Sequence, residues 1–202
     1  MSKNMTVEKT FASAIQNHQK NNFKAAEDLY NQILEIDPNH IKTIFFLGTL
    51  SVQTKNFDRA KQMLQKTIQA QPNNVDAYNN LGVVFKEFEE FQKAKDCFEK
   101  VIQIQPQHVD ALNNLGNVFK QLNEPQKAIN YYQKAIEIEP SYINAHQNLM
   151  DVCEKTNQIT ELKDAVSNAR TFFKDNSIIK LYEGILLSRN EKFVEAKNCL
   201  EL

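Results

Sequence analysis

The sequence predicts an all-α fold in which about six helix-turn-helix repeats stack into a solenoid. The first observation behind this prediction is a set of four prolines that recur at one fixed interval, Pro38, Pro72, Pro106 and Pro140. The second is that residues aligned on this period form uniform columns of leucine (Leu47, Leu81, Leu115, Leu149), glycine (Gly48, Gly82, Gly116) and alanine (Ala26, Ala60, Ala94, Ala128). A fixed period of this kind indicates tandem copies of one supersecondary unit.

Each repeat contains the pattern of two amphipathic helices, which we name A and B. In the repeat over 75–108, Tyr78, Leu81 and Phe85 recur at helical spacing, and Ala94 and Phe98 do so further along. The small residues of the glycine and alanine columns allow the two helices to approach closely. The proline then ends helix B, because it has no backbone N–H and disfavours the helical conformation in the residue before it.

Taken in order, residues 1–6 are predicted to be a disordered N-terminus and residues 7–202 a single array. The array divides into repeats over 7–40, 41–74, 75–108, 109–142 and 143–176, and an incomplete sixth repeat over 177–202. In the first repeat, Phe11 and Ile15 shift the apolar face along helix A. In the sixth, the apolar edge at Cys199 and Leu200 has no polar helix after it, which arrays normally need for solubility. Either the natural chain continues past Leu202, or this edge meets another chain, and one possibility is self-association with a second copy.

The composition disfavours several classes of partner. Lys and Arg number 24 and Asp and Glu number 25, and the resulting net charge of -1 gives no field that would attract nucleic acid. The first residues are polar and contain no secretion signal, and no stretch approaches the roughly 18 apolar residues of a membrane span. We therefore expect a cytoplasmic protein that binds neither nucleic acid nor membrane.

The sequence also lacks the patterns of catalytic and metal sites. It has no Gly-rich phosphate loop, no GxSxG and no HExxH, so we expect no enzyme activity, no cofactor and no metal in this chain. Its three cysteines are too few and too dispersed for a disulfide framework or a zinc site, and we interpret them as reduced core residues: Cys97, Cys153 and Cys199. His40 and His108 fall in equivalent turns between repeats, where capping is the expected role.

The period and its columns resemble the tetratricopeptide repeat, a helix-turn-helix unit in which large apolar, small, small and aromatic positions precede a proline. The aromatic column here is Tyr30, Leu64, Phe98 and Tyr132. The resemblance is clearest over 41–142 and extends, more loosely, over 7–202. It implies a right-handed superhelix whose A helices line a concave groove that holds a peptide or a partner protein.

Asparagines occupy the A-helix positions that packing leaves free in the middle of the array. Three of them recur at the same interval as the prolines and form one row: Asn80, Asn114 and Asn148. Asn79 and Asn113 lie beside this row, and Asn117 one turn along. Adjacent helices are about 8–10 Å apart, close to three residues of extended peptide at about 3.3 Å each. Because an amide both donates and accepts, the row could bind a peptide backbone with little sequence specificity. The alternative is that these side chains are solvated or bond their own helices.

Towards the N-terminus the same positions are largely apolar: Phe45, Phe46, Thr49 and Val52, preceded by Phe11 and Ile15. We expect an apolar pocket there, with Phe46 as an anchor for the ligand. The alternative is that Phe11 and Ile15 form the core of the first repeat. Lys86 and Lys120 are equivalent residues near the ends of successive A helices, and they either favour acidic ligands or are simply solvated.

The segments 76–87 and 110–121 resemble the repeats that precede the catalytic domain of O-GlcNAc transferase and its bacterial relatives. In that family an asparagine ladder holds the substrate polypeptide, and Asn80, Asn114 and Asn148 fall at the matching places. The segments 14–23 and 26–34 likewise resemble the first repeat of bacterial proteins that join such an array to a glycosyltransferase or sulfotransferase domain. No transferase domain is present in this sequence.

The sequence therefore predicts a protein-interaction scaffold that binds an extended peptide or a partner protein in the groove. The alternative hypothesis is an N-terminal substrate-recruiting module of a larger glycosyltransferase or sulfotransferase. A chaperone-tail binder is disfavoured, because Ile178 and Tyr182 stand where the carboxylate clamp of that branch has a lysine and an arginine.

Overall fold

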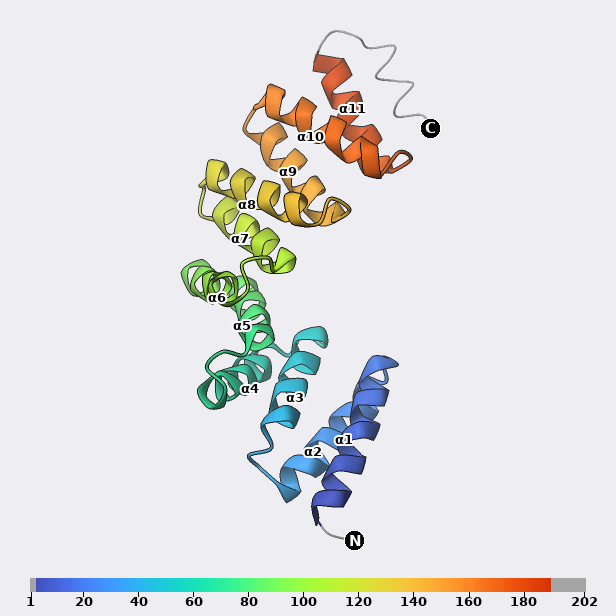
Figure 1. Ribbon diagram of the computed structural model, residues 1–202, viewed down its shortest axis with the longest axis vertical. Helices are drawn as coiled ribbons and strands as arrows, with labels where there is room; N and C mark the ends of the chain where they lie inside the picture. The colour runs from blue at the N-terminus through green and yellow to red at the C-terminus, as the bar shows by residue number, and fades with distance from the viewer. Residues whose placement is uncertain (1–2, 190–202) are drawn as a thin grey trace. The chain divides into compact units, whose positions relative to one another are not determined.

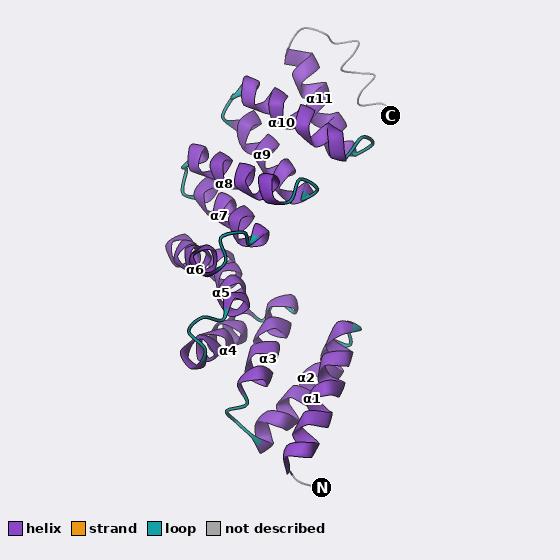
Figure 2. Cartoon of the chain, viewed as in Figure 1, coloured by secondary structure: helices purple, strands orange, loops and turns teal. Residues whose placement is uncertain are grey.

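The computed structural model describes the backbone of residues 3–189 and the side chains of residues 6–189. Within that range the chain forms eleven α-helices and no strands (Figures 1 and 2). The helices gather into two compact units, unit 1 up to Gln105 and unit 2 from Pro106. The sequence analysis predicts a single array over 7–202, whereas the structure divides it into these two units. The boundary at Pro106 has the same proline-ended turn as the other repeat junctions, so the sequence does not indicate a division there.

Unit 1 contains three helix hairpins. Its A helices are α1 (Lys3–Gln19), α3 (Ile41–Gln53) and α5 (Val75–Glu87), and its B helices are α2 (Phe23–Ile36), α4 (Phe57–Ala70) and α6 (Phe91–Ile104). Helix α1 starts at Lys3, so residues 3–6 are helical, whereas we expected them to be disordered. That stretch contains neither proline nor glycine, and the Thr10 hydroxyl donates to the Thr6 carbonyl at 2.9 Å inside the helix.

Unit 2 continues the pattern with A helices α7 (Val109–Gln121), α9 (Ile143–Lys155) and α11 (Ser177–Arg189), and B helices α8 (Pro125–Ile138) and α10 (Ile159–Phe172). Helix α11 is the first helix of the incomplete sixth repeat. The self-association edge expected at Cys199 and Leu200 lies outside the described residues.

The turns between repeats form as the proline column predicts. Helices α2, α4, α6 and α8 each end two residues before a proline of the column. The next A helix is then capped at its start: the Asn74 side chain accepts from the Ala77 N–H at 2.9 Å. His40 and His108 cap α3 and α7 in the same way through Nδ1. The expected capping role of these two histidines is confirmed.

The turns inside the hairpins contain a further column with the same period, which residue type reveals only in part because two of its five members are not asparagine. Five residues there have a left-handed backbone, with φ between 56° and 59°: Asn21, Lys55, Glu89, Asn123 and Asn157. This conformation closes the end of an A helix; in the second hairpin, for example, the Asn56 N–H donates to the Ser51 carbonyl at 2.8 Å. Lysine and glutamate rarely adopt it, which is why the column is hard to recognise in the sequence.

The core of each hairpin is the close contact that the small residues permit. Every residue of the alanine column and of the aromatic column is fully buried. Gly82 and Gly116 lie directly against the rings of Phe98 and Tyr132, respectively. Cys97 and Cys153 are buried and free, as expected for core residues, and burial raises the pKa of the Cys153 thiol to about 11.

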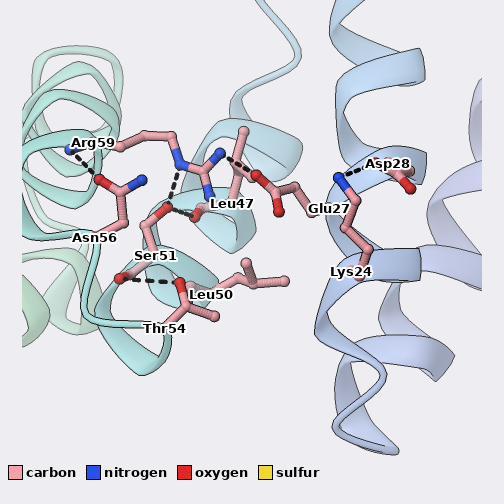
Figure 3. A network of polar contacts seen from close by, with 9 residues as sticks. All are labelled: Lys24, Glu27, Asp28, Leu47, Leu50, Ser51, Thr54, Asn56 and Arg59. Atoms are coloured by element: carbon pink, nitrogen blue, oxygen red, sulfur yellow. Dashed lines mark hydrogen bonds and ion pairs between the residues drawn. The ribbon is translucent and has the colours of Figure 1, made fainter.

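A cation on each of three B helices packs against the A helix before it. Arg59 of α4 donates through Nε to the buried Ser51 hydroxyl at 2.8 Å, and through its terminal nitrogen to Glu27 of α2 (Figure 3). The equivalent Lys93 and Lys127 lie over the rings of Phe85 and Phe119, at 5.5 and 5.2 Å from their centroids. Arg59 differs because it joins three helices.

Replacing Arg59 with lysine is expected to lower the free energy of unfolding by about 1 kcal/mol, because an ammonium group cannot reach both acceptors as the guanidinium fork does. Urea denaturation of the two proteins measures this difference. The control is Lys24→Ala, which removes an exposed ion pair to Asp28 (2.9 Å) and should cost less than about 0.5 kcal/mol. Equal losses in the two variants would contradict the prediction.

Candidate functional site

The residues predicted to bind a ligand lie on A helices of both units. Phe46 of α3 and Asn80 of α5 occupy the same repeat position in unit 1, and Asn114 of α7 and Asn148 of α9 occupy it in unit 2. All four side chains are partly exposed. Since α3 contacts α5 and α7 contacts α9, each unit presents this repeat position on two neighbouring A helices.

Asn80 is held by the helix before it. Its Nδ2 atom donates to the Thr49 hydroxyl oxygen at 3.1 Å, and the Thr49 hydroxyl in turn donates to the Phe45 carbonyl at 3.1 Å. The Oδ1 atom of Asn80 has no partner among the described residues, yet it is not among the buried unpaired atoms. Solvent, or a ligand, therefore reaches this oxygen.

The other asparagines in and beside the row differ in which side-chain atoms are buried or hydrogen-bonded. Asn79 has a buried Oδ1 atom without a hydrogen-bond partner, and Asn113 is 6% exposed. Asn113 accepts a hydrogen bond from Nδ2 of Asn148 at 2.9 Å, which joins α7 to α9. Asn114 makes no side-chain hydrogen bond in the described part of the chain, so its whole amide is available.

Asn117 has a packing role within its own hairpin. Its Oδ1 atom accepts from the Tyr132 hydroxyl of α8 at 2.9 Å. Burial raises the pKa of Tyr132, so the phenol stays neutral and keeps the proton that it donates. This carbonyl oxygen is therefore already used inside the protein.

The two predicted lysines have different surroundings. Lys120 forms an ion pair with Asp151 of α9 at 3.3 Å, and Lys155 forms a second one at 2.8 Å. Burial alone would raise the pKa of Asp151, but the hydrogen bonds and charges of Lys155 and Lys120 outweigh it and lower the pKa. Lys86 forms no ion pair within residues 6–189. Its role towards acidic ligands remains a prediction.

Phe46 belongs to an aromatic cluster at the α1–α2–α3 junction. Its ring centroid lies 5.7 Å from that of Phe11 and 5.2 Å from that of Phe45, and it stacks on Tyr30 at 6.4 Å. Phe11 and Ile15 are partly buried and pack against the core of the first hairpins, as the alternative interpretation expects. Phe46 packs against this core as well and is partly exposed.

His18 fixes the same junction, a role that sequence reasoning missed. Its Nδ1 lies 3.1 Å from the Tyr30 hydroxyl of α2, and its Nε2 lies 2.8 Å from Oε1 of Gln53 on α3. Because Oε1 of Gln53 can only accept, the ring donates through Nε2 to Gln53 and accepts at Nδ1 from the Tyr30 hydroxyl. Burial raises the pKa of Tyr30 to about 12, so the phenol keeps the proton that it donates. Nothing in the repeat pattern marks this histidine, because its partners come from two other helices.

The B helices α8 and α10 of unit 2, together with Leu149 of α9, line a separate open pocket of about 360 Å³. Glu137, Glu161 and Asp164 line it, and none of the three forms an ion pair among the described side chains. The pocket contains none of the predicted ligand-binding residues. Across residues 6–189 no cluster of three metal-ligating side chains is found, and none of the described helices is long and apolar enough to cross a membrane.

Comparison with known proteins identifies the repeats. One family model described as tetratricopeptide repeat matches residues 75–108 and 109–142, and a second with the same description matches residues 18–82. The chain carries tetratricopeptide repeats. No curated protein matches the sequence. The narrower resemblance to transferase-linked arrays remains a prediction.

Solved structures of tetratricopeptide solenoids agree with the predicted all-α fold. A crystal structure of MamA is 26% identical to this chain, with a TM-score of 0.74, and the match covers 84% of this chain and 92% of MamA. PilF of Pseudomonas aeruginosa is 18% identical, with a TM-score of 0.81 and coverage of 97% and 89%. YrrB, described as a TPR protein with an unusual peptide-binding site, is 19% identical, with a TM-score of 0.67 and coverage of 85% and 89%. At these identities PilF and YrrB indicate the fold alone.

Proposed function

We propose that this tetratricopeptide protein is an interaction scaffold that binds an extended segment of a partner protein along its A helices. The observation that carries the proposal is the open amide chemistry of the row. Asn80 leaves its Oδ1 atom free in unit 1, and Asn114 leaves its whole amide free in unit 2. Asparagine is a mediocre helix former, so its recurrence at one partly exposed position of successive A helices favours a role beyond folding.

The chemistry of the row suits a peptide backbone. A peptide bond offers one N–H and one carbonyl, and an asparagine amide can pair with either. Extended peptide advances about 3.3 Å per residue, so three residues span the distance of about 8–10 Å between packed helices. Within unit 1 the preceding A helix has the partly exposed Phe46 at the position that Asn80 occupies, and this side chain would contact an apolar side chain of the same peptide.

The neighbour YrrB offers independent support, since it is described as having a peptide-binding site on a tetratricopeptide fold. The identity of 19% makes this an analogy of architecture, without transfer of residues. The proposal therefore depends on the side chains of this chain and must be tested on them.

The test uses a peptide selected from a random-sequence phage-displayed library against the full chain. Replacing Asn80, Asn114 and Asn148 together with alanine should weaken its binding about tenfold or more, because each lost neutral hydrogen bond is worth roughly 0.5–1.5 kcal/mol. Fluorescence anisotropy measures the affinity, and circular dichroism checks that helicity is retained.

The matched control replaces three exposed asparagines of B helices with alanine: Asn31, Asn130 and Asn168. This variant makes the same chemical change away from the row, and its affinity should equal that of the parent chain. If the row variant also binds like the parent, peptide binding by the asparagines is refuted.

A further inference from the structure

Two linked hydrogen bonds, from Asn80 to Thr49 and from Thr49 to the Phe45 carbonyl, influence which end of the Asn80 amide faces outwards. The Thr49 hydroxyl donates to the Phe45 carbonyl four residues earlier, the usual back-bond of a threonine inside a helix. A hydroxyl has one proton, so Thr49 can offer Asn80 only an acceptor. Asn80 must therefore turn its NH₂ group towards Thr49, as the contact of 3.1 Å between Nδ2 and Oγ1 records.

This arrangement points the carbonyl oxygen of Asn80 away from Thr49, where it has no partner and remains accessible. An amide normally presents either end to a ligand by rotating through half a turn. Here the rotation would set Oδ1 of Asn80 against the Thr49 oxygen, whose proton is engaged with Phe45. The two acceptors would repel unless Thr49 turned its proton away from Phe45, which would break the back-bond inside α3. The bonds at Thr49 therefore favour the orientation in which the carbonyl oxygen of Asn80 faces outwards.

We infer that Thr49 is a positioning residue that makes Asn80 a hydrogen-bond acceptor towards the ligand, so that Asn80 receives a backbone N–H of the bound peptide. This inference rests on the proposed peptide binding. It assigns the donor and the acceptor of one hydrogen bond in unit 1: a backbone N–H of the peptide donates, and the Asn80 carbonyl oxygen accepts.

The other asparagines of the row have no back-bonded hydroxyl group beside them to orient the amide. Asn148 donates to Asn113, whose own amide could be reversed together with it, so no single acceptor fixes their orientation. Asn114 has no side-chain partner in the described part of the chain. The residues that occupy the position of Thr49 in later repeats are Val83, Asn117, Asp151 and Ile185, and none of them has a hydroxyl group. This positioning arrangement therefore belongs to the second repeat of the chain and is not a general property of the array.

The test combines Thr49→Val with a backbone scan of the library-selected peptide, in which each N–H in turn is replaced by N-methyl. Valine has nearly the shape of threonine without the hydroxyl, and Val83 shows that the repeat accepts it at this position. One N-methyl position should weaken binding to the parent chain about fivefold or more, as expected for one lost hydrogen bond. The same N-methyl group should cost less than about twofold with Asn80→Ala, because the contact is already lost, and with Thr49→Val, because the amide of Asn80 is no longer held with its oxygen outwards.

Thr49→Ser is the decisive control. Serine keeps the hydroxyl and its back-bond to Phe45, so this variant should recover the parent affinity and the parent N-methyl penalty. A purely structural role of Thr49 predicts instead that Thr49→Val weakens all peptides equally and leaves every N-methyl penalty unchanged. That result, or a failure of serine to rescue, overturns the inference.

The outcomes separate this inference from the proposed function. If the triple asparagine variant binds the peptide like the parent chain, the proposed function fails and the inference fails with it. If the triple variant binds weakly but Thr49→Val shows the full N-methyl penalty, peptide binding by the row stands and only the positioning role of Thr49 is refuted.

Discussion

Gly116→Ala is expected to destabilise unit 2 by about 2 kcal/mol or more, because overpacking a well-packed core costs roughly 1–3 kcal/mol or more. A Cβ atom at this position would lie 2.3 Å from Cε1 and 2.6 Å from Cδ1 of Tyr132. The ring has little freedom to move away, since Tyr132 is fully buried and its hydroxyl is bonded to Asn117. Elsewhere in a helix the same substitution would stabilise by about 1 kcal/mol, so the steric effect must exceed that gain.

The three glycines of the column form a graded series for this experiment. At Gly82 the nearest atom would be Cε1 of Phe98 at 2.7 Å, and at Gly48 it would be Cβ of Met63 at 3.1 Å. Urea denaturation of the three alanine variants should therefore show the largest loss at Gly116, a smaller loss at Gly82 and little change or a gain at Gly48. Equal effects at all three positions would contradict a steric origin.

Acidification is expected to destabilise the chain through His146, the fully buried histidine of α9. Its Nε2 donates to the Pro140 carbonyl at 2.9 Å, its Nδ1 is buried without a partner, and its ring lies against Phe173 at a centroid distance of 5.5 Å. Burial disfavours the charged ring and lowers the pKa of His146 from 6.5, and the bond to Pro140 opposes this shift only in part.

The direction of the pH effect follows from that lowered pKa. As the pH falls below 6.5 the unfolded chain takes up a proton at this histidine that the folded chain does not. The free energy of unfolding then decreases by up to about 1.4 kcal/mol for each pH unit, until the pH reaches the lowered pKa of the folded state. Above pH 6.5 the ring is neutral in both the folded and the unfolded state, so His146 contributes no pH dependence to the free energy of unfolding there.

The matched variant is His146→Gln, which can still donate to the Pro140 carbonyl but takes up no proton. Urea midpoints measured from about pH 7.5 down to about pH 4.5 should fall more steeply for the parent chain than for this variant. The carboxyl of Asp151, whose pKa is lowered from 3.8, loses its stabilising ion pairs only at still lower pH and does not interfere. Parallel curves would contradict the role of His146.

The repeat pattern predicted the fold because each of its columns acts locally. The prolines end the B helices, the small residues allow the hairpins to close, and Asn74 caps the next A helix within three residues. These effects act within one repeat, so one sequence period is enough to recognise them. The left-handed residues Lys55 and Glu89 escaped recognition because their side chains are atypical of that conformation.

The candidate site was predictable only in outline. The repeat spacing places Asn80, Asn114 and Asn148 at one position of successive A helices. It does not say that Asn117 bonds Tyr132, that Asn113 is buried, or that Lys120 is paired with Asp151. Except for the bond within the Asn117 hairpin, these properties depend on the side chains that the next A helix brings alongside.

The sequence by itself therefore determined the all-α repeat, its register and the position of the asparagine row, because those follow from helical periodicity and the turn preferences of single residues. Only the tertiary structure decided which amide atoms remain open. Asn80 meets Thr49 across 31 residues of chain, and Asn148 meets Asn113 across 35. Such partners are chosen by the packing of neighbouring helices and by side-chain orientation, and these are set only when the repeats stack.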